Sequence, residues 1–160
     1  MQPRLATADD AAEVVRLAAM LFASMGLAVS PTGPGAGGSD WQEAGRRHVG
    51  ERAGKDVAAF VVDHPDQPGR LVASAAGSIS RRLPTPFSPS GCAGYVQWVC
   101  TEPEFRGRGL ARAVMSSLLA WFDSQDVRTV ELHATPMAES LYLQLGFDDS
   151  GPRALRRRRW

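Results

Sequence analysis

The chain has 160 residues, a net charge of +1, 44% hydrophobic residues and 22% charged residues. This composition excludes a disordered, collagen-like or coiled-coil chain, and the length suits one domain over residues 1–160. The apolar runs are far shorter than the roughly 20 residues of a membrane-spanning helix, and the N-terminus lacks the pattern of a signal peptide.

The N-terminal part of the chain is predicted to hold one short strand and two helices. The strand lies over Pro3–Ala6. Apolar residues then recur at helical spacing, and Gly26 ends this helix; its apolar face comprises Val14, Leu17, Ala18, Leu21, Phe22 and Met25. The segment Gly26–Ser39 is rich in Gly, Pro and Ser and is predicted to be a loop. Asp40 then opens a second helix that ends near Ala53.

Strand-like segments dominate the middle of the chain. Three are predicted over Val57–Asp63, Leu71–Arg82 and Gly94–Thr101, joined by Pro- and Gly-rich loops, which indicates an antiparallel meander. The later predicted elements are a helix over about Gly109–Gln125, a strand over Thr129–Ala134, a short helix over Met137–Leu145 and one or two edge strands within Phe147–Trp160. A strand–helix–strand unit favours parallel strands, so we expect an α/β fold with a mixed sheet flanked by helices.

A turn rich in glycine and arginine, Arg106-Gly107-Arg108-Gly109-Leu110-Ala111, lies between the best predicted strand and the best predicted helix. A helix N-terminus presents unpaired N–H groups and the positive end of its dipole, and glycine lets the backbone approach an anion closely. Arg106 and Arg108 add charge-assisted donors. The turn therefore predicts a binding site for a pyrophosphate group.

Several kinds of site share such a turn. A P-loop requires a lysine after its last glycine, but Leu110 follows Gly109. A dinucleotide-binding fingerprint has a small residue where this chain has Arg112, although Glu131 lies near the place of a ribose-binding acid. The acyl-CoA-binding pattern R/Q-x-x-G-x-G/A is filled by Arg106, Gly109 and Ala111. A plain helix start with an arginine-rich turn is the structural alternative.

Residues Tyr95–Phe147 resemble the core of the GNAT superfamily of acyl-CoA-dependent N-acetyltransferases. The segment Val99–Ala111 resembles its central strand and pyrophosphate loop. The segment Leu141–Phe147, with the sequence LYLQLGF, resembles its later helix, which commonly ends L-Y-x-x-L-G-F. The two motifs cover about a third of the chain. This resemblance implies a GNAT-like mixed sheet with splayed central strands, and an enzyme that uses acetyl-CoA and no metal.

The resemblance also implies a role for each matching residue. Backbone groups of Val99 and Thr101 would pair with pantetheine in the gap beside the central strand. The diphosphate would lie beside Arg106 and bind the N–H groups of Gly107, Arg108, Gly109, Leu110, Ala111 and Arg112. Tyr142 matches the tyrosine that often protonates the departing CoA thiolate, and packing on an amphipathic helix is the alternative role for it.

The general base is where the chain departs from the family pattern. Some members carry a glutamate on the central strand, whereas this chain has Tyr95 there and Gln97 next on the same face. His133, expected to share one face of the following strand with Glu131, is the candidate base, because imidazole titrates nearest neutrality. A structural role for His133 and a water relay ending at several groups are the alternatives. Two further acids before the turn, Glu102 and Glu104, are expected to be structural or solvated.

The sequence therefore predicts an N-acetyltransferase acting on a primary amine of a small molecule or peptide. Direct attack in a ternary complex is expected, because neither Cys92 nor Cys100 lies at an evident His-paired position. The acceptor is expected between the loops Gly26–Asp40 and Leu83–Ala93, whose only acid is Asp40. This favours a small neutral or amphipathic amine. The missing strand carboxylate motivates a second hypothesis, a non-catalytic acyl-CoA-binding or sensor domain.

Charge and cysteine usage bear on partners and location. Arginines fill five of the last ten positions, and the remaining chain is mildly acidic, which argues against a nucleic-acid partner. The run Arg156–Arg159 has three candidate contacts: an acidic partner, the CoA 3′-phosphate or water. The two cysteines follow no metal or disulfide spacing, so we expect a cytoplasmic protein with no metal and no membrane partner. Pairing through sheet edges, common in the family, makes a homodimer a further expectation.

Overall fold

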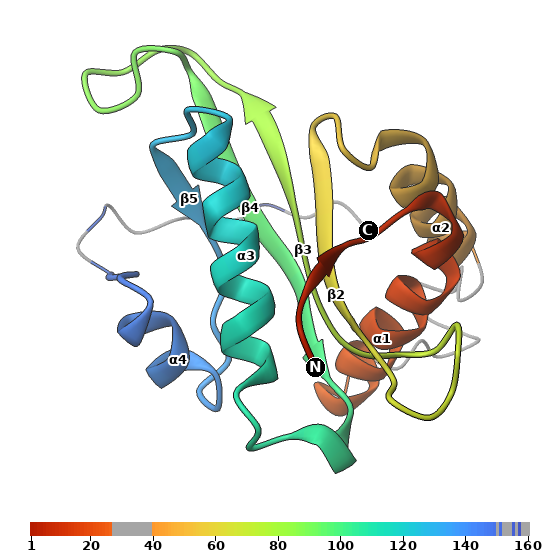
Figure 1. Cartoon of the computed structure of the whole chain (residues 1–160). Coiled ribbons are helices and arrows are strands. Elements are labelled where there is room, and N and C mark those ends of the chain that lie inside the picture. The colour runs from red at the N-terminus through yellow and green to blue at the C-terminus, as the bar shows by residue number, and fades with distance from the viewer. Residues whose placement is uncertain (27–39, 150, 152–154, 156, 158–160) are drawn as a thin grey trace.

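The computed structural model describes residues 1–26, 40–149, 151, 155 and 157, and these residues form a five-stranded sheet flanked by helices (Figure 1). The strands follow one another across the sheet: β1 (Arg4–Leu5), β2 (Val57–Asp63), β3 (Leu71–Arg81), β4 (Cys92–Thr101) and β5 (Thr129–Glu131). All neighbouring pairs are antiparallel except β4 and β5, which are parallel. The helices are α1 (Ala11–Ser24), α2 (Asp40–Arg52), α3 (Leu110–Ser124) and α4 (Glu139–Gln144).

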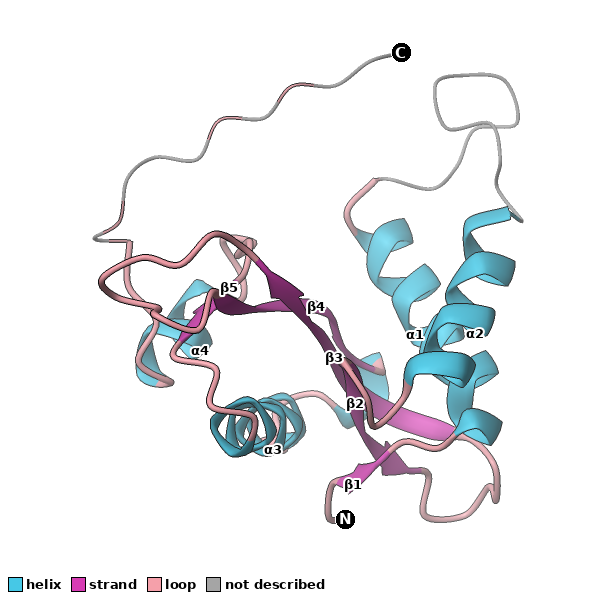
Figure 2. Ribbon diagram, turned by 90° about the horizontal axis from the view of Figure 1, so that it is seen from above, coloured by secondary structure: helices cyan, strands magenta, loops and turns pink. Residues whose placement is uncertain are grey.

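The helices cover both faces of the sheet. Figure 2 shows α1 and α2 on one side of the strands and α3 and α4 on the other. Each side has its own apolar core, one around Val114, Leu118 and Phe122 of α3 and one around Val14 and Leu17 of α1. The helical periodicity of the sequence thus places one apolar stripe of each long helix against the sheet. Among the described residues, no helix is long and apolar enough to cross a membrane.

Two glycines bring α3 close to the sheet. A Cβ atom at Gly77 of β3 would stand 2.7 Å from Cζ of Phe122, and one at Gly94 of β4 would stand 2.8 Å from its Cε1. Real Cβ atoms do not approach other atoms so closely, so any larger residue would push the ring away. Phe122 is fully buried, and its ring fills the space that the missing side chains leave.

A β-bulge interrupts the pairing of β4 with β3. The register joins Ser74 to Cys100 and Ala76 to Gln97, so that two residues of β4, Trp98 and Val99, lie opposite a single residue of β3. Trp98 has φ of +52°, in the left-handed region that bulky residues rarely adopt. An extra residue on one strand bends that strand and re-aims its side chains.

On its other side β4 pairs with β5 only from Ala93 to Tyr95. Beyond Tyr95 the two strands separate, and no other described strand takes the place of β5 along the rest of β4. The predicted mixed sheet with splayed central strands is confirmed. The free edge that this separation creates is where the candidate site lies.

The sequence prediction was wrong in the length of one strand. β5 ends at Glu131 rather than Ala134, because β4 turns away and leaves the following residues without a partner. His133 therefore lies in the segment between β5 and α4 and does not share a strand face with Glu131. No described residue of Phe147–Trp160 belongs to a strand, and most of the Arg156–Arg159 run and of the Gly26–Ser39 loop lies outside the described residues.

Candidate active site

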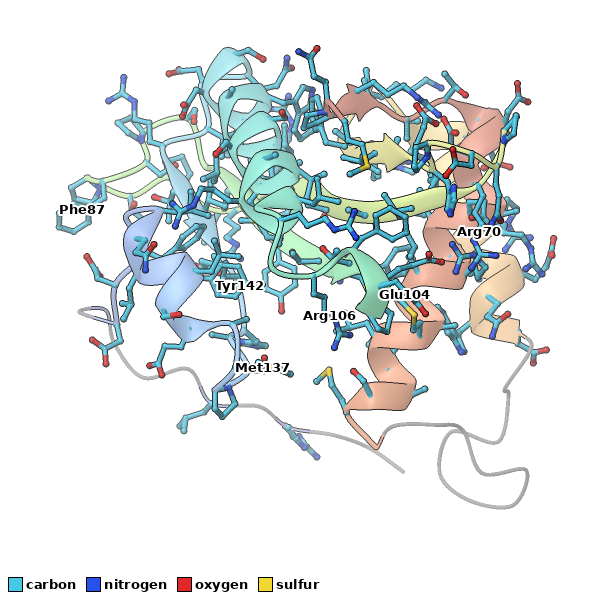
Figure 3. The ribbon with its side chains drawn as sticks, turned by 60° about the horizontal axis from the view of Figure 1, so that its bottom comes forward. Arg70, Phe87, Glu104, Arg106, Met137 and Tyr142 are labelled. Atoms are coloured by element: carbon cyan, nitrogen blue, oxygen red, sulfur yellow. The ribbon has the colours of Figure 1, made fainter. Side chains whose placement is uncertain are left out.

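A cavity of about 620 Å³ opens beside the free edge of β4. Its walls come from the end of α1, from β4, from the turn before α3, and from the segment between β5 and α4. Figure 3 shows Arg106 of the turn, Met137 of the segment before α4, and Tyr142 of α4, which also lines the cavity. It brings together ten of the site residues predicted from the sequence: Val99, Thr101, Arg106, Gly107, Gly109, Leu110, Ala111, Arg112, His133 and Tyr142.

The turn before α3 has the backbone that an anion site needs. Gly107 and Gly109 have φ of +72° and +76°, and a Cβ atom at either would meet open space. The backbone N–H groups from Gly107 to Arg112 donate to no backbone carbonyl within the described chain. Because α3 starts at Leu110, the positive end of its dipole lies at this turn. The turn thus offers several unsatisfied donors to a phosphate group.

Three guanidinium groups surround this turn, and none forms an ion pair with a described carboxylate. Arg106 Nε donates to the carbonyl oxygen of Thr101 at 3.2 Å, and Arg112 donates to the side-chain oxygen of Gln144. Arg108 donates to the carbonyl oxygen of Glu104 at 3.1 Å and stacks on the ring of Phe105, 4.9 Å from its centroid. Arg108 is the one predicted site residue that does not line the cavity.

Thr101 carries an unsatisfied polar atom at the end of β4. Its Oγ1 is buried and has no hydrogen-bond partner in the described chain. Leaving a buried hydroxyl unpaired costs about 1–3 kcal/mol, so such atoms mark places where a ligand or water completes the structure. With the donors of the turn, this hydroxyl fits a long ligand that has polar groups and an anionic end.

Tyr142 projects from α4 into the same cavity. Only 8% of the residue is exposed, and its ring packs edge-on against Phe147 at 6.0 Å. The phenol makes no hydrogen bond to another described group. Burial raises the pKa of Tyr142 above its ordinary value of 10, so the hydroxyl holds its proton at neutral pH. The geometry supports a proton donor at this position.

His133 lies across the cavity on the segment after β5. Its ring packs edge-on against that of Tyr95, with 5.8 Å between the centroids. His133 is exposed and lines the cavity together with Tyr95 and Gln97. Tyr95 and Gln97 lie on one face of β4, and neither is a carboxylate. His133 is thus the imidazole of the lining and remains the candidate proton acceptor.

Two carboxylates adjacent in sequence to lining residues are bound to arginines. Glu102 is 4% exposed and accepts from Arg16 Nη1 at 2.8 Å and Arg70 Nη2 at 2.9 Å, which ties the end of β4 to α1. Glu131 forms two hydrogen bonds of 2.8 Å with Arg82, and this pairing lowers the pKa of Glu131. Neither is available as a base or as the ribose-binding acid of a dinucleotide site. Among the described residues, no group of His, Cys, Asp and Glu could hold a metal ion.

The sequence missed one wall of the cavity. Leu21, Phe22 and Met25 belong to the predicted apolar face of the first helix, but they lie at the exposed end of that helix and line the cavity. Trp98 joins them because the bulge turns it into the same region. The available signal was the apolar stripe itself, which continues to the last turn of α1, beyond the buried part of the helix.

Comparison with known proteins identifies the family to which the chain belongs. Residues 76–158 match the model of a family described as an acetyltransferase (GNAT) domain. No curated protein matches the chain.

Solved structures share the architecture over almost the whole chain. A GCN5-related N-acetyltransferase from Ralstonia eutropha JMP134 is 22% identical, with a TM-score of 0.77 over 98% of this chain and 97% of its own. A predicted acetyltransferase from Clostridium acetobutylicum, solved with acetyl-CoA, is 20% identical, with a TM-score of 0.80 over 98% and 95%. The aminoglycoside N-acetyltransferase AAC(6')-Iy, solved with a bisubstrate analogue, is 18% identical, with a TM-score of 0.71 over 99% and 98%. At these identities the similarities establish the fold.

Proposed function

Because the chain belongs to the GNAT acetyltransferase family, we propose that it transfers an acetyl group from acetyl-CoA to a primary amine of a small molecule or peptide. Direct attack in a ternary complex is the proposed route. The observation that carries the proposal is the single cavity at the free edge of β4, which joins the unsatisfied N–H groups of the turn, Thr101 Oγ1 and Tyr142.

The binding role follows from the donors. The N–H groups of Gly107, Arg108, Gly109, Leu110, Ala111 and Arg112 hold the diphosphate, and the Arg106 and Arg112 side chains add charge-assisted bonds. Backbone groups of Val99 and Thr101, on the part of β4 that β5 leaves uncovered, pair with the pantetheine amides. Acetyl-CoA, when bound, supplies the acetyl group as an activated thioester.

The transfer needs three proton movements. The acceptor nitrogen must be neutral to attack, so the ammonium proton passes to His133 or to water beside it. As the new N–C bond forms, the C–S bond breaks, and Tyr142 Oη gives its proton to the departing sulfur. The nitrogen sheds a second proton to become the amide, and this proton returns the Tyr142 phenolate to its phenol form. Strand N–H groups near Val99 stabilise the charge that develops on the carbonyl oxygen.

The cysteine of the cavity supports direct transfer over a covalent acyl-enzyme. Cys100 lines the cavity, but burial raises the pKa of its thiol, and no hydrogen bond joins it to a His of the described residues. A protonated thiol is a poor nucleophile. The acetyl group therefore passes to the amine in one step.

Three wider expectations belong to the same proposal. Residues 1–160 form one domain, the protein works in the cytoplasm, and two copies pair as a homodimer. Gel filtration with light scattering measures the last of these directly.

The test is release of CoA. The protein is mixed with acetyl-CoA and a panel of amines, free thiol is followed with a thiol reagent, and the acetylated amine is identified by mass spectrometry. We expect CoA release that depends on both the protein and the amine. Acetyl-CoA should also raise the melting temperature, whereas NAD should not.

The alternative is a non-catalytic acyl-CoA-binding or sensor domain, which the missing strand carboxylate favours. Tight binding of acetyl-CoA in calorimetry with no CoA release across the whole panel would establish it. A melting temperature that responds to NAD and not to acetyl-CoA would reject both forms of the proposal.

A further inference from the structure

The charged side chains that line the cavity limit the number of positive charges that an acceptor can carry. We infer that the acceptor is a monoamine carried on an apolar or aromatic body, with no second positive charge. This inference rests on the proposed acetyl transfer and names the substrate class of that same site.

The first observation is that no carboxylate lines the cavity. The chain has 17 Asp and Glu residues, and all of them are among the described residues, because the segments outside the description contain no acid. None of the 17 belongs to the lining, whose charged side chains are Arg106 and Arg112. Two acids nearby, Glu102 and Glu131, are already engaged by arginines.

A second ammonium group would therefore enter at a cost. It would lose part of its hydration in the cavity and find no opposite charge to replace it. The two guanidinium groups of the lining are assigned to the diphosphate, so they offer no opposite charge to it either. An acceptor with one amine avoids this cost, because the amine that reacts gives up its proton.

The second observation is the apolar wall. Leu21, Phe22 and Met25 from the end of α1 and Trp98 from the bulge of β4 line the cavity. The ring of Trp41 on α2 supports two of them, with its centroid 5.2 Å from that of Phe22 and 6.2 Å from that of Trp98. Burial of apolar area against such a wall contributes roughly 25 cal/mol per Å².

The sequence that follows this wall is also uncharged. Residues 27–39, directly after Met25 and Gly26, contain no Asp, Glu, Lys, Arg or His. This stretch of sequence therefore holds no counter-charge for a polycation. An apolar body on the amine matches the wall, and a polyamine or aminoglycoside does not.

The experiment compares two amines that differ by one charge. Hexylamine and 1,6-diaminohexane have the same six-carbon chain, and kcat/KM for each is measured at saturating acetyl-CoA and the same pH. We expect hexylamine to be preferred at least tenfold. The diamine has two equivalent amines, and either can react. This statistical advantage raises kcat/KM for the diamine and works against the expected preference for hexylamine.

A variant with a new carboxylate should weaken the preference for hexylamine over the diamine. Met25 lines the cavity and is 45% exposed, so Met25→Glu places a carboxylate on the acceptor wall with little disturbance of the core. The preference for hexylamine should fall at least fivefold in this variant. The matched control is Leu5→Glu, which adds the same charge at a 42% exposed position outside the lining and should leave the ratio unchanged.

The outcomes separate the two proposals. Equal kcat/KM values, or a preference for the diamine, overturn the inference and leave the acetyl transfer standing. CoA release with neither these amines nor any other of the panel overturns both. The comparison of the two amines on the unmodified protein needs no variant, so it decides the inference even if Met25→Glu folds poorly.

Discussion

The Nε atom of Arg106 donates a hydrogen bond to the carbonyl oxygen of Thr101, 3.2 Å away. This bond joins the end of β4 to the turn before α3. The backbone N–H of the next residue, Glu102, points the other way and donates to Val72 on β3. Thr101 therefore turns its carbonyl toward the free edge, where Arg106 covers it. The strand proposed for pantetheine and the turn proposed for the diphosphate are held in one position by this contact.

Gly109→Asp should weaken acetyl-CoA binding at least 100-fold. The new side chain would occupy the open space beside the turn and bring a negative charge to the phosphate site. The dissociation constant from isothermal titration calorimetry is the measurement.

The control for this variant separates strain from binding. Gly54→Asp places the same residue at φ of +79°, also with open space around it, in a turn away from the cavity. This variant should lose comparable stability and keep its affinity for acetyl-CoA. Unchanged affinity in Gly109→Asp would remove the turn from the binding site.

Tyr142→Phe should lower kcat at least tenfold and leave acetyl-CoA affinity unchanged, because only the proton donor is removed. Since burial raises the pKa of Tyr142, the phenol stays protonated across neutral and mildly alkaline pH. The ratio of wild-type to variant kcat should therefore be the same at pH 7 and pH 9. Tyr95→Phe, the only other tyrosine and also in the lining, is the matched control. An unchanged kcat in Tyr142→Phe would show that Tyr142 serves packing and donates no proton in the reaction.

Asp10→Asn should reduce the free energy of unfolding by about 1 kcal/mol at pH 7, a modest value because its partner Arg4 is 40% exposed. Hydrogen bonds from Arg4, at 2.8 Å, hold the pKa of Asp10 at about 2, against an ordinary 3.8. A carboxyl with a lowered pKa stabilises the fold above its ordinary pKa and loses this effect as the pH falls through the folded value.

The difference between the Asp10→Asn variant and wild type should therefore close between about pH 4 and pH 2 in urea denaturation. Asp9→Asn, in the same turn of the chain at an exposed position, should change stability little at any pH. A constant difference across this range would show that the Arg4 contact is not its source.

Gly94→Ala should destabilise the fold by about 1–3 kcal/mol, since its Cβ would stand 2.8 Å from the ring of Phe122. The cost depends on that ring alone, so Phe122→Leu in the same chain should recover part of it. A double-mutant cycle of unfolding free energies measures the coupling. Additive effects of the two substitutions would show that the destabilisation by Gly94→Ala does not come from contact with the Phe122 ring.

Elements with their own apolar pattern were predicted well. α1, α3 and β2 lie within a few residues of their predicted bounds, because each buries a stripe or face that shows in its periodicity. β5 was predicted too long for the opposite reason. Alternation continues to Ala134, but a strand needs a partner, and β4 has already turned away after Tyr95. The apolar and polar alternation of one segment does not show how far that segment pairs with a distant strand.

By itself, the sequence determined the turn proposed for the diphosphate, because glycine φ angles, helix-end donors and arginine charge are local properties of six consecutive residues. It also placed Tyr142 on the short helix α4. Only the tertiary structure decided that the end of α1 and the bulge at Trp98 form the other wall, and that no acid reaches it. That wall depends on how far strands part and which helix end lies beside the gap, and these distances arise only when the whole sheet packs between its helices.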